Sequence, residues 1–173
     1  MTTEHKVFIG IGLATVILIG GGVFWASNQT GFSAKPLLGQ NVPISGRQHF
    51  PDDTKITYDT NPPAEGNHYP EAQDAGVYTT APADGHLVHS LEHGAVILWY
   101  NPKLLSQDQV KQLTNLFNSI SLSKTIMTPR ESMDVSVAVT SWGRILKLES
   151  IDEKQIKAFF ETNYNRGPEQ API

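Results

Sequence analysis

The hydrophobic pattern of the chain begins with one long apolar run. Residues 7–26 read VFIGIGLATVILIGGGVFWA, twenty apolar or small residues with no charge among them. A helix of this length rises about 30 Å, the thickness of the hydrocarbon core of a bilayer. A cleaved signal peptide is the alternative, but its apolar core is usually only about 7–15 residues long. We therefore predict a retained transmembrane helix over residues 7–26.

The segments around this helix give the expected organisation of the chain. We expect residues 1–6 to form a cytoplasmic tail, residues 27–44 a linker, and residues 45–173 a domain on the extracytoplasmic side. A signal anchor is the simplest topology for an N-terminal span, although the few flanking charges leave the opposite orientation open. The expected location is thus the cell membrane, with a single pass, and the lipid bilayer is the first expected partner.

The first part of the domain, residues 45–85, has little regular hydrophobic pattern. Prolines interrupt it repeatedly and forbid long helices, at Pro51, Pro62, Pro63, Pro70 and Pro82. Only Lys55–Tyr58 is typical of a strand. A stretch of roughly 40 residues with so little regular structure is unusual in a compact domain and is often functional. We expect a layer of loops rich in proline and glycine.

From Ala95 onward the pattern predicts strand, helix, strand, strand, strand and helix. Residues 95–100 are a continuous apolar run, typical of a buried central strand. Ser106 and Gln109 have capping-box spacing, and apolar positions then continue a helix to about Leu122.

Short strands are predicted at residues 125–128, 135–139 and 144–148, with a turn at Trp142-Gly143. Ser150 and Glu153 have capping-box spacing for a helix to about Tyr164, stopped by Arg166-Gly167-Pro168. The order predicts an α+β fold, a small two-layer sandwich with two helices on one face of a mainly antiparallel sheet.

Composition limits the chemistry that this domain can perform. The net charge is −4 and no basic run exists, which argues against a nucleic-acid partner. The chain has no cysteine, so thiolate metal sites and cysteine nucleophiles are excluded. Histidine, aspartate and glutamate remain as strong metal ligands.

Three of the six histidines lie in residues 85–94, GHLVHSLEHG. In a helix, His86, His89 and His93 would fall within roughly 60° of one another, opposite an apolar side. In a strand, His89 and His93 would lie about 13 Å apart, too far to share one ion. The sequence leaves open which of the two conformations this segment adopts.

His49 and His68, on the proline-rich loops, are the other candidate ligands in the domain. Neutral imidazole is a good ligand for zinc and copper. A single histidine is more often a hydrogen-bonded or surface residue, and for His86 this is the favoured interpretation. For His89 and His93 the spacing of four residues suits a shared ion on a helix.

His89-Ser90-Leu91-Glu92-His93 also satisfies the H-x-x-E-H pattern of inverted zincins, in which a glutamate activates water. The pattern is short and a β-type run follows it at once. Inverted zincins also have far longer chains.

Several further segments are informative as a set. They are Gly46 with His49; Asn61-Pro62-Pro63 with Gly66 and His68; Gly76 and Tyr78; His89 to Gly94 leading to Tyr100-Asn101-Pro102; Ala138 with Trp142-Gly143-Arg144; and Arg166-Gly167-Pro168-Glu169. Together they resemble a bacterial family known as domain-of-unknown-function family 3105, whose members carry an N-terminal anchor before a histidine-bearing domain. One departure is Ala64-Glu65, where the family has a small residue and serine before the glycine.

The resemblance marks His49, His68, His89 and His93 as the family-motif histidines, leaves His86 outside, and implies no reaction. We therefore expect a copper or zinc ion on these four histidines, with Glu92 as a further ligand or as an acceptor that orients an imidazole. A metal-free interaction module for a membrane-protein partner is the competing hypothesis. A zinc-dependent hydrolase that uses the H-x-x-E-H segment is the second alternative.

Overall fold

The structure, a computed structural model, describes residues 36–173. The predicted transmembrane helix and cytoplasmic tail, and the first half of the linker, lie outside these residues. Within the described part of the chain, no helix has the length and apolar character needed to cross a membrane.

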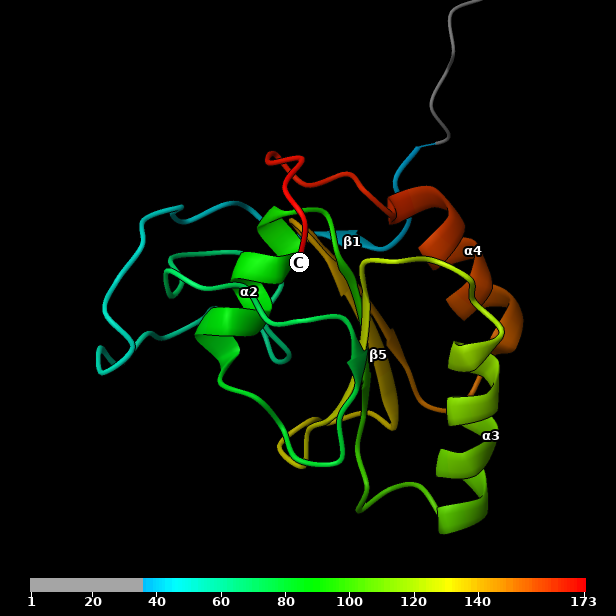
Figure 1. The fold of residues 1–173 in the computed structure, drawn as a ribbon. Helices are drawn as coiled ribbons and strands as arrows, with labels where there is room; N and C mark the ends of the chain where they lie inside the picture. Colours follow the sequence, from blue (N-terminus) through cyan, green and yellow to red (C-terminus); the bar gives the residue numbers. More distant parts are fainter. Residues whose placement is uncertain (1–35) are drawn as a thin grey trace, which may run out of the picture. The chain divides into compact units, whose positions relative to one another are not determined.

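A six-stranded sheet forms the centre of the described domain (Figure 1). Its order across the sheet is β1 (Gln40–Asn41), β6 (Arg144–Leu148), β5 (Val137–Ser141), β3 (Val96–Tyr100), β4 (Thr125–Pro129) and β2 (Gly76–Val77). All five residues of β3 are buried, as the apolar run predicted. The α+β class is confirmed.

The sheet is mixed: three of its five strand pairings are antiparallel, as predicted, and two are parallel, which the sequence did not predict. β3 pairs antiparallel with β5 on one side and parallel with β4 on the other. The parallel pairing arises because helix α3 (Gln107–Asn118) connects β3 to β4 and returns the chain to the end of the sheet where β3 began. β2 adds a second parallel pair at the edge beyond β4.

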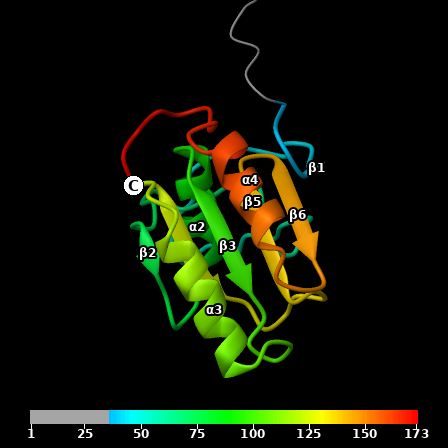
Figure 2. The ribbon, with the colours of Figure 1, turned by 90° about the vertical axis from the view of Figure 1, so that its right-hand side faces the viewer.

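Two helices cover one face of the sheet, α3 and α4 (Glu153–Asn163), as Figure 2 shows. Alternate residues of β3 point to this side, so that Val96 and Leu98 pack with Leu113 of α3 and Phe159 of α4. The predicted capping box at the start of α3 is confirmed, because Ser106 and Gln109 bond to each other's backbone N–H.

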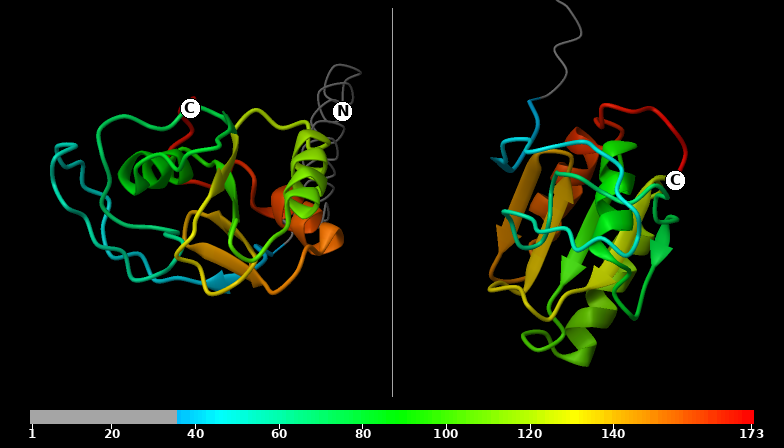
Figure 3. Two further views of the ribbon diagram at one scale, coloured as in Figure 1. Left: turned by 90° about the horizontal axis from the view of Figure 1, so that it is seen from below. Right: turned by 90° about the vertical axis from the view of Figure 1, so that its left-hand side faces the viewer.

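A third helix, α2 (Asp84–Glu92), covers the opposite face, whereas the predicted two-layer fold placed both of its helices on one face. Leu87 and Leu91 of α2 pack against Ile97 and Trp99 of β3. The structure therefore has helices on both faces of the sheet rather than two layers (Figure 3). This result also answers the question that the sequence left open, because the histidine segment is helical.

The proline-rich segment lies outside α2 in a long loop, and residues 45–75 contain no helix and no strand beyond one isolated bridge. The predicted strand at Lys55–Tyr58 is therefore wrong. Tyr58 is instead tied across the loop, where its hydroxyl donates to the Asn67 carbonyl at 3.0 Å. The isolated bridge joins His49 to His68.

The start of α4 differs from the prediction. Asp152, and not Ser150, is the N-cap, and its carboxylate accepts from the Gln155 backbone N–H at 3.0 Å. Aspartate is among the best N-cap residues, so it displaces the cap by two positions. The helix ends at Asn163, close to the predicted end, and Asn165 then takes a left-handed φ of 55°.

We predict that replacing the true cap destabilises the domain, whereas replacing the expected one does not. Asp152→Ala should lower the free energy of unfolding by about 1 kcal/mol, because the first turn of α4 loses its side-chain acceptor. Ser150→Ala, an exposed neighbour, is the matched control and should change little. Urea denaturation of both variants measures the difference, and equal losses would contradict the assignment of the cap.

Candidate metal centre

Helix α2 brings three candidate residues to one end of the domain. His89 and Glu92 are buried within the helix, with 5% and 1% of their surfaces exposed, and His93 follows as its C-cap. The rings of His89 and His93 are 4.4 Å apart between centroids. Gly94 ends the helix with a φ of +88°, a conformation that favours glycine, and the chain enters β3.

The long loop brings the other two histidines onto this helix. The backbone bridge between His49 and His68 is formed by Phe50 N–H donating to the His68 carbonyl at 2.8 Å and His68 N–H donating to the Gln48 carbonyl at 3.0 Å. Gly85 allows the loop to approach closely, since a Cβ there would lie 2.4 Å from the Tyr69 ring. The loop therefore packs directly on α2.

Four residues converge at this contact. The ring centroids of His49, His68 and His89 are 4.7–4.8 Å apart in every pairing. One ligand atom from each of these histidines and one from Glu92 all lie within 4.8 Å of one another. We name these four residues the inner group.

The His68 ring shows why this group is suited to a cation. Its Nδ1 lies 2.9 Å from the Gly66 carbonyl oxygen, which can only accept, so in the neutral ring the proton is on Nδ1. The lone pair is then on Nε2, which is fully buried and makes no hydrogen bond. That Nε2 faces Glu92 Oε2 at 3.0 Å. Either a cation bound to both atoms or a proton on Nε2 would relieve the repulsion between two electron-rich atoms at this separation.

The Glu92 carboxylate is fixed by a residue that the sequence had not singled out. Arg47 Nε donates to Glu92 Oε1 at 2.6 Å, while half of the Arg47 side chain stays exposed. The ion pair compensates the buried charge and directs the second oxygen toward His68.

Burial keeps the imidazoles of His68 and His89 neutral. Desolvation lowers the pKa of His68, and the nearby Glu92 carboxylate only partly opposes this effect. Desolvation, followed by repulsion from His68, His93 and His49, lowers the pKa of His89 to about 4. Both rings are therefore in the form that binds metal at neutral pH.

A second set of ligand atoms adjoins the first. His89, His93 and Glu169 also place one ligand atom each within 4.8 Å of one another, and we name them the outer group. His93 Nδ1 lies 2.7 Å from the Pro172 carbonyl oxygen, and its Nε2 lies 3.5 Å from Glu169 Oε2. The C-terminal segment thus folds back onto the end of α2, as Figure 1 shows.

The predicted site residues are therefore distributed over two groups rather than around one point. His49, His68, His89 and Glu92 form the inner group, whereas His93 joins it only through His89. His86 lies outside both groups and bonds instead to the Glu71 carbonyl at 2.7 Å. Sequence reasoning gave no role to Arg47 or Glu169, and the only signal for Glu169 was its place in the last family-like segment.

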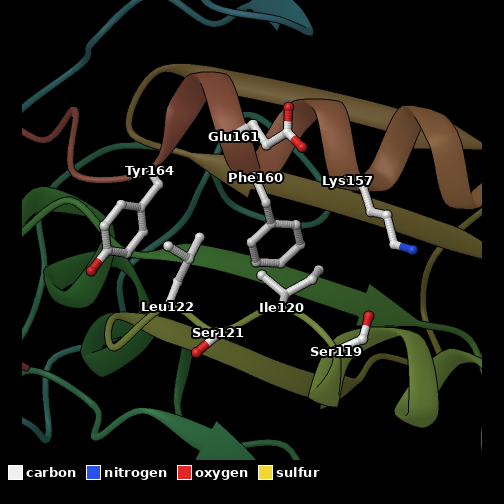
Figure 4. A pocket seen from close by; sticks show the side chains of 8 residues that line it. All are labelled: Ser119, Ile120, Ser121, Leu122, Lys157, Phe160, Glu161 and Tyr164. Atoms are coloured by element: carbon white, nitrogen blue, oxygen red, sulfur yellow. The ribbon is translucent and has the colours of Figure 1, made fainter.

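The domain also has an apolar hollow on the other face of the sheet, between the ends of α3 and α4 (Figure 4). Its lining residues include one acid and one lysine but no histidine: Ser119, Ile120, Ser121, Leu122, Lys157, Phe160, Glu161 and Tyr164. The histidines and this hollow are on opposite sides of β3, so the hollow does not serve the candidate metal centre.

We predict that the metal-free domain loses stability as the pH falls below 6.5. The unfolded histidines take up protons near pH 6.5, whereas folded His89 does so only near pH 4 and folded His68 below its usual pKa. The unfolded state therefore binds more protons in this window, and each such histidine lowers the free energy of unfolding by about 1.4 kcal/mol per pH unit. Above pH 6.5 this effect is absent.

Denaturant unfolding from pH 7.5 to 4.5 measures this slope. His89→Gln should flatten it, while His86→Gln, which leaves His68 and His89 in place, should keep it. An unchanged slope in His89→Gln would contradict the prediction, whatever the absolute stability of that variant.

Comparison with known proteins agrees with the resemblance noted in the sequence. Residues 49–172 match the family model described as "Protein of unknown function (DUF3105)". No curated protein and no solved structure matches the chain. The matched region contains both histidine groups and covers well over half of the sequence, so the chain belongs to the DUF3105 family.

Proposed function

We propose that this protein binds one transition-metal ion, copper or zinc, through the inner group of His49, His68, His89 and Glu92. The observation that carries the proposal is the distance of 3.0 Å between His68 Nε2 and Glu92 Oε2. The nitrogen is buried and has no hydrogen-bond partner. Two ligands of one ion, each at about 2.0–2.1 Å, have a similar separation. A bound cation would satisfy both atoms at once.

The donor set favours copper or zinc over calcium or magnesium. Three of its four members are imidazoles, and nitrogen ligands suit Zn²⁺ and Cu²⁺, whereas Ca²⁺ and Mg²⁺ prefer an oxygen shell. The low pKa values of His68 and His89 support this choice, because protons do not compete for the rings at neutral pH.

The metal-free interaction module is less well supported by the same contact. Without an ion, the His68–Glu92 approach would need a proton on His68 Nε2, and burial lowers the pKa of that ring. The hydrolase alternative is weakened by Arg47. One oxygen of Glu92 accepts from Arg47 and the other faces His68, so neither is free to activate a water molecule.

Metal content of the full chain, purified in mild detergent without a histidine tag, tests the proposal. We expect about one copper or zinc ion per chain after loading and dialysis, measured by elemental mass spectrometry. His68→Ala should weaken binding by at least about a hundredfold, because it removes one of the four proposed ligands.

His86→Ala is the matched control, since it removes an imidazole from the same helix but from neither group. It should retain the ion with unchanged affinity. Absence of bound copper and zinc from a folded wild-type sample would overturn the proposal and favour the interaction module.

We also propose that residues 7–26 anchor the domain in the cell membrane with residues 45–173 on the extracytoplasmic side. The length and apolar character of the run support this proposal. The full chain should sediment with membranes, whereas a chain that begins at Leu37 should not. Protease added outside intact cells, after removal of any outer membrane, should degrade the domain, and protection of the domain would contradict the orientation.

A further inference from the structure

The outer group has the same construction as the inner group. In each, a histidine Nδ1 lies against a backbone carbonyl, Gly66 for His68 and Pro172 for His93. In each, the remaining Nε2 faces a carboxylate oxygen, from Glu92 at 3.0 Å and from Glu169 at 3.5 Å. Arg47 contacts the other oxygen of both carboxylates, at 2.6 Å and 3.9 Å. The outer group is thus a second set of oriented metal ligands.

The two groups cannot readily hold two ions at the same time. His89 is common to both, and a neutral imidazole has one free lone pair, so it serves one ion at a time. Two divalent ions beside Arg47 would also face only two carboxylates, Glu92 and Glu169, which leaves a large excess of positive charge.

The groups differ in access to solvent. Glu169 is 44% exposed, whereas the side chains of His68 and Glu92 are 0% and 2% exposed. His49 is exposed as well, but its ligand atom is an imidazole nitrogen, whereas Glu169 offers a carboxylate that attracts cations. An ion that arrives from solvent would therefore bind first to the outer group, which offers an exposed carboxylate.

The C-terminal segment is held where it presents this carboxylate. Glu169 N–H donates to the Glu92 carbonyl at 3.1 Å, and Asn165 N–H donates to the Gly94 carbonyl at 2.8 Å. A Cβ at Gly167 would lie 2.1 Å from the Glu92 carbonyl oxygen, so glycine permits the close approach. These backbone contacts place Glu169 independently of its own side chain.

From these observations we infer that His89, His93 and Glu169 form a loading position, from which His89 passes a single copper or zinc ion to the inner group. This inference rests on the proposed function. The ion would first bind to the outer group, and His68 and Glu92 would then replace His93 and Glu169 as ligands while His89 stays bound. No bond of the protein changes and no electron is transferred.

The binding kinetics of Cu²⁺ test this inference. The Trp142 ring is 6.2 Å from the His68 ring, so quenching of tryptophan fluorescence by Cu²⁺ in the inner group can be followed by stopped flow. Glu169→Gln and His93→Ala should each slow association about tenfold and slow dissociation by the same factor. A position that only lowers the barrier acts equally in both directions, so the equilibrium affinity should not change.

Glu149→Gln is the matched control for Glu169→Gln, because it removes one exposed carboxylate outside both groups. Its rates should equal those of the wild type.

Unchanged rates in Glu169→Gln and His93→Ala would overturn the loading position while leaving the inner site intact. Faster dissociation with weaker affinity would also overturn it, by showing that these residues are ligands of the stored ion. Two ions per wild-type chain would contradict a single transferred ion, and no ion at all would overturn the proposed function itself.

Discussion

The buried carboxylate of Glu92 is the constraint on which the arrangement of this domain depends. Its side chain is 2% exposed, and an isolated buried charge would cost several kcal/mol. One oxygen is satisfied by Arg47, which lies at the start of the long loop, and the other faces His68 near the middle of that loop. The loop must therefore fold over α2. A second buried acid, Glu65, supports the same path by accepting from the Ser45 backbone and hydroxyl.

The sheet gives this loop a rigid surface against which to fold. Helix α2 is held on β3 by Leu87 and Leu91, so its histidines project from a packed element rather than from a mobile turn. Side chains on a fixed helix keep their separations better than side chains on loops alone. His49 and His68 lie on a loop and lack such support. The backbone bridge between them, with its two hydrogen bonds, fixes their positions relative to each other instead.

The sequence predicted the elements whose signal is local. The run at β3, the capping box of α3 and the hairpin of β5 and β6 all follow from patterns within about ten residues. The helical conformation of residues 84–92 could not be predicted in this way, because nine residues with a histidine every third or fourth position fit a helix or a strand. The parallel pairing of β3 with β4 could be inferred only from the helix that connects them.

The candidate site was predictable as a set of residue types but not as a geometry. Chemistry and the family-like segments identified His49, His68, His89 and Glu92 as candidates. Only the fold shows that His93 lies outside this group of four. Arg47 and Glu169 are 45 and 77 residues from Glu92 along the chain, and no periodicity links such distances. Their roles arise from ion pairs that form only when the loop and the C-terminal segment reach the same end of α2.

The charge balance at this end of the helix gives the proposed site its selectivity. Arg47 neutralises Glu92, so the inner group offers a cation three imidazoles and almost no net negative charge. Calcium and magnesium depend on carboxylate charge for their affinity and gain little from such a site. Zinc and copper form strong bonds to imidazole nitrogen, so their affinity depends less on negative charge in the site. Glu169 lies 3.9 Å from Arg47, farther than Glu92 does, and its carboxylate is at the surface. Attraction of the ion and its selective retention would thus be performed by different residues.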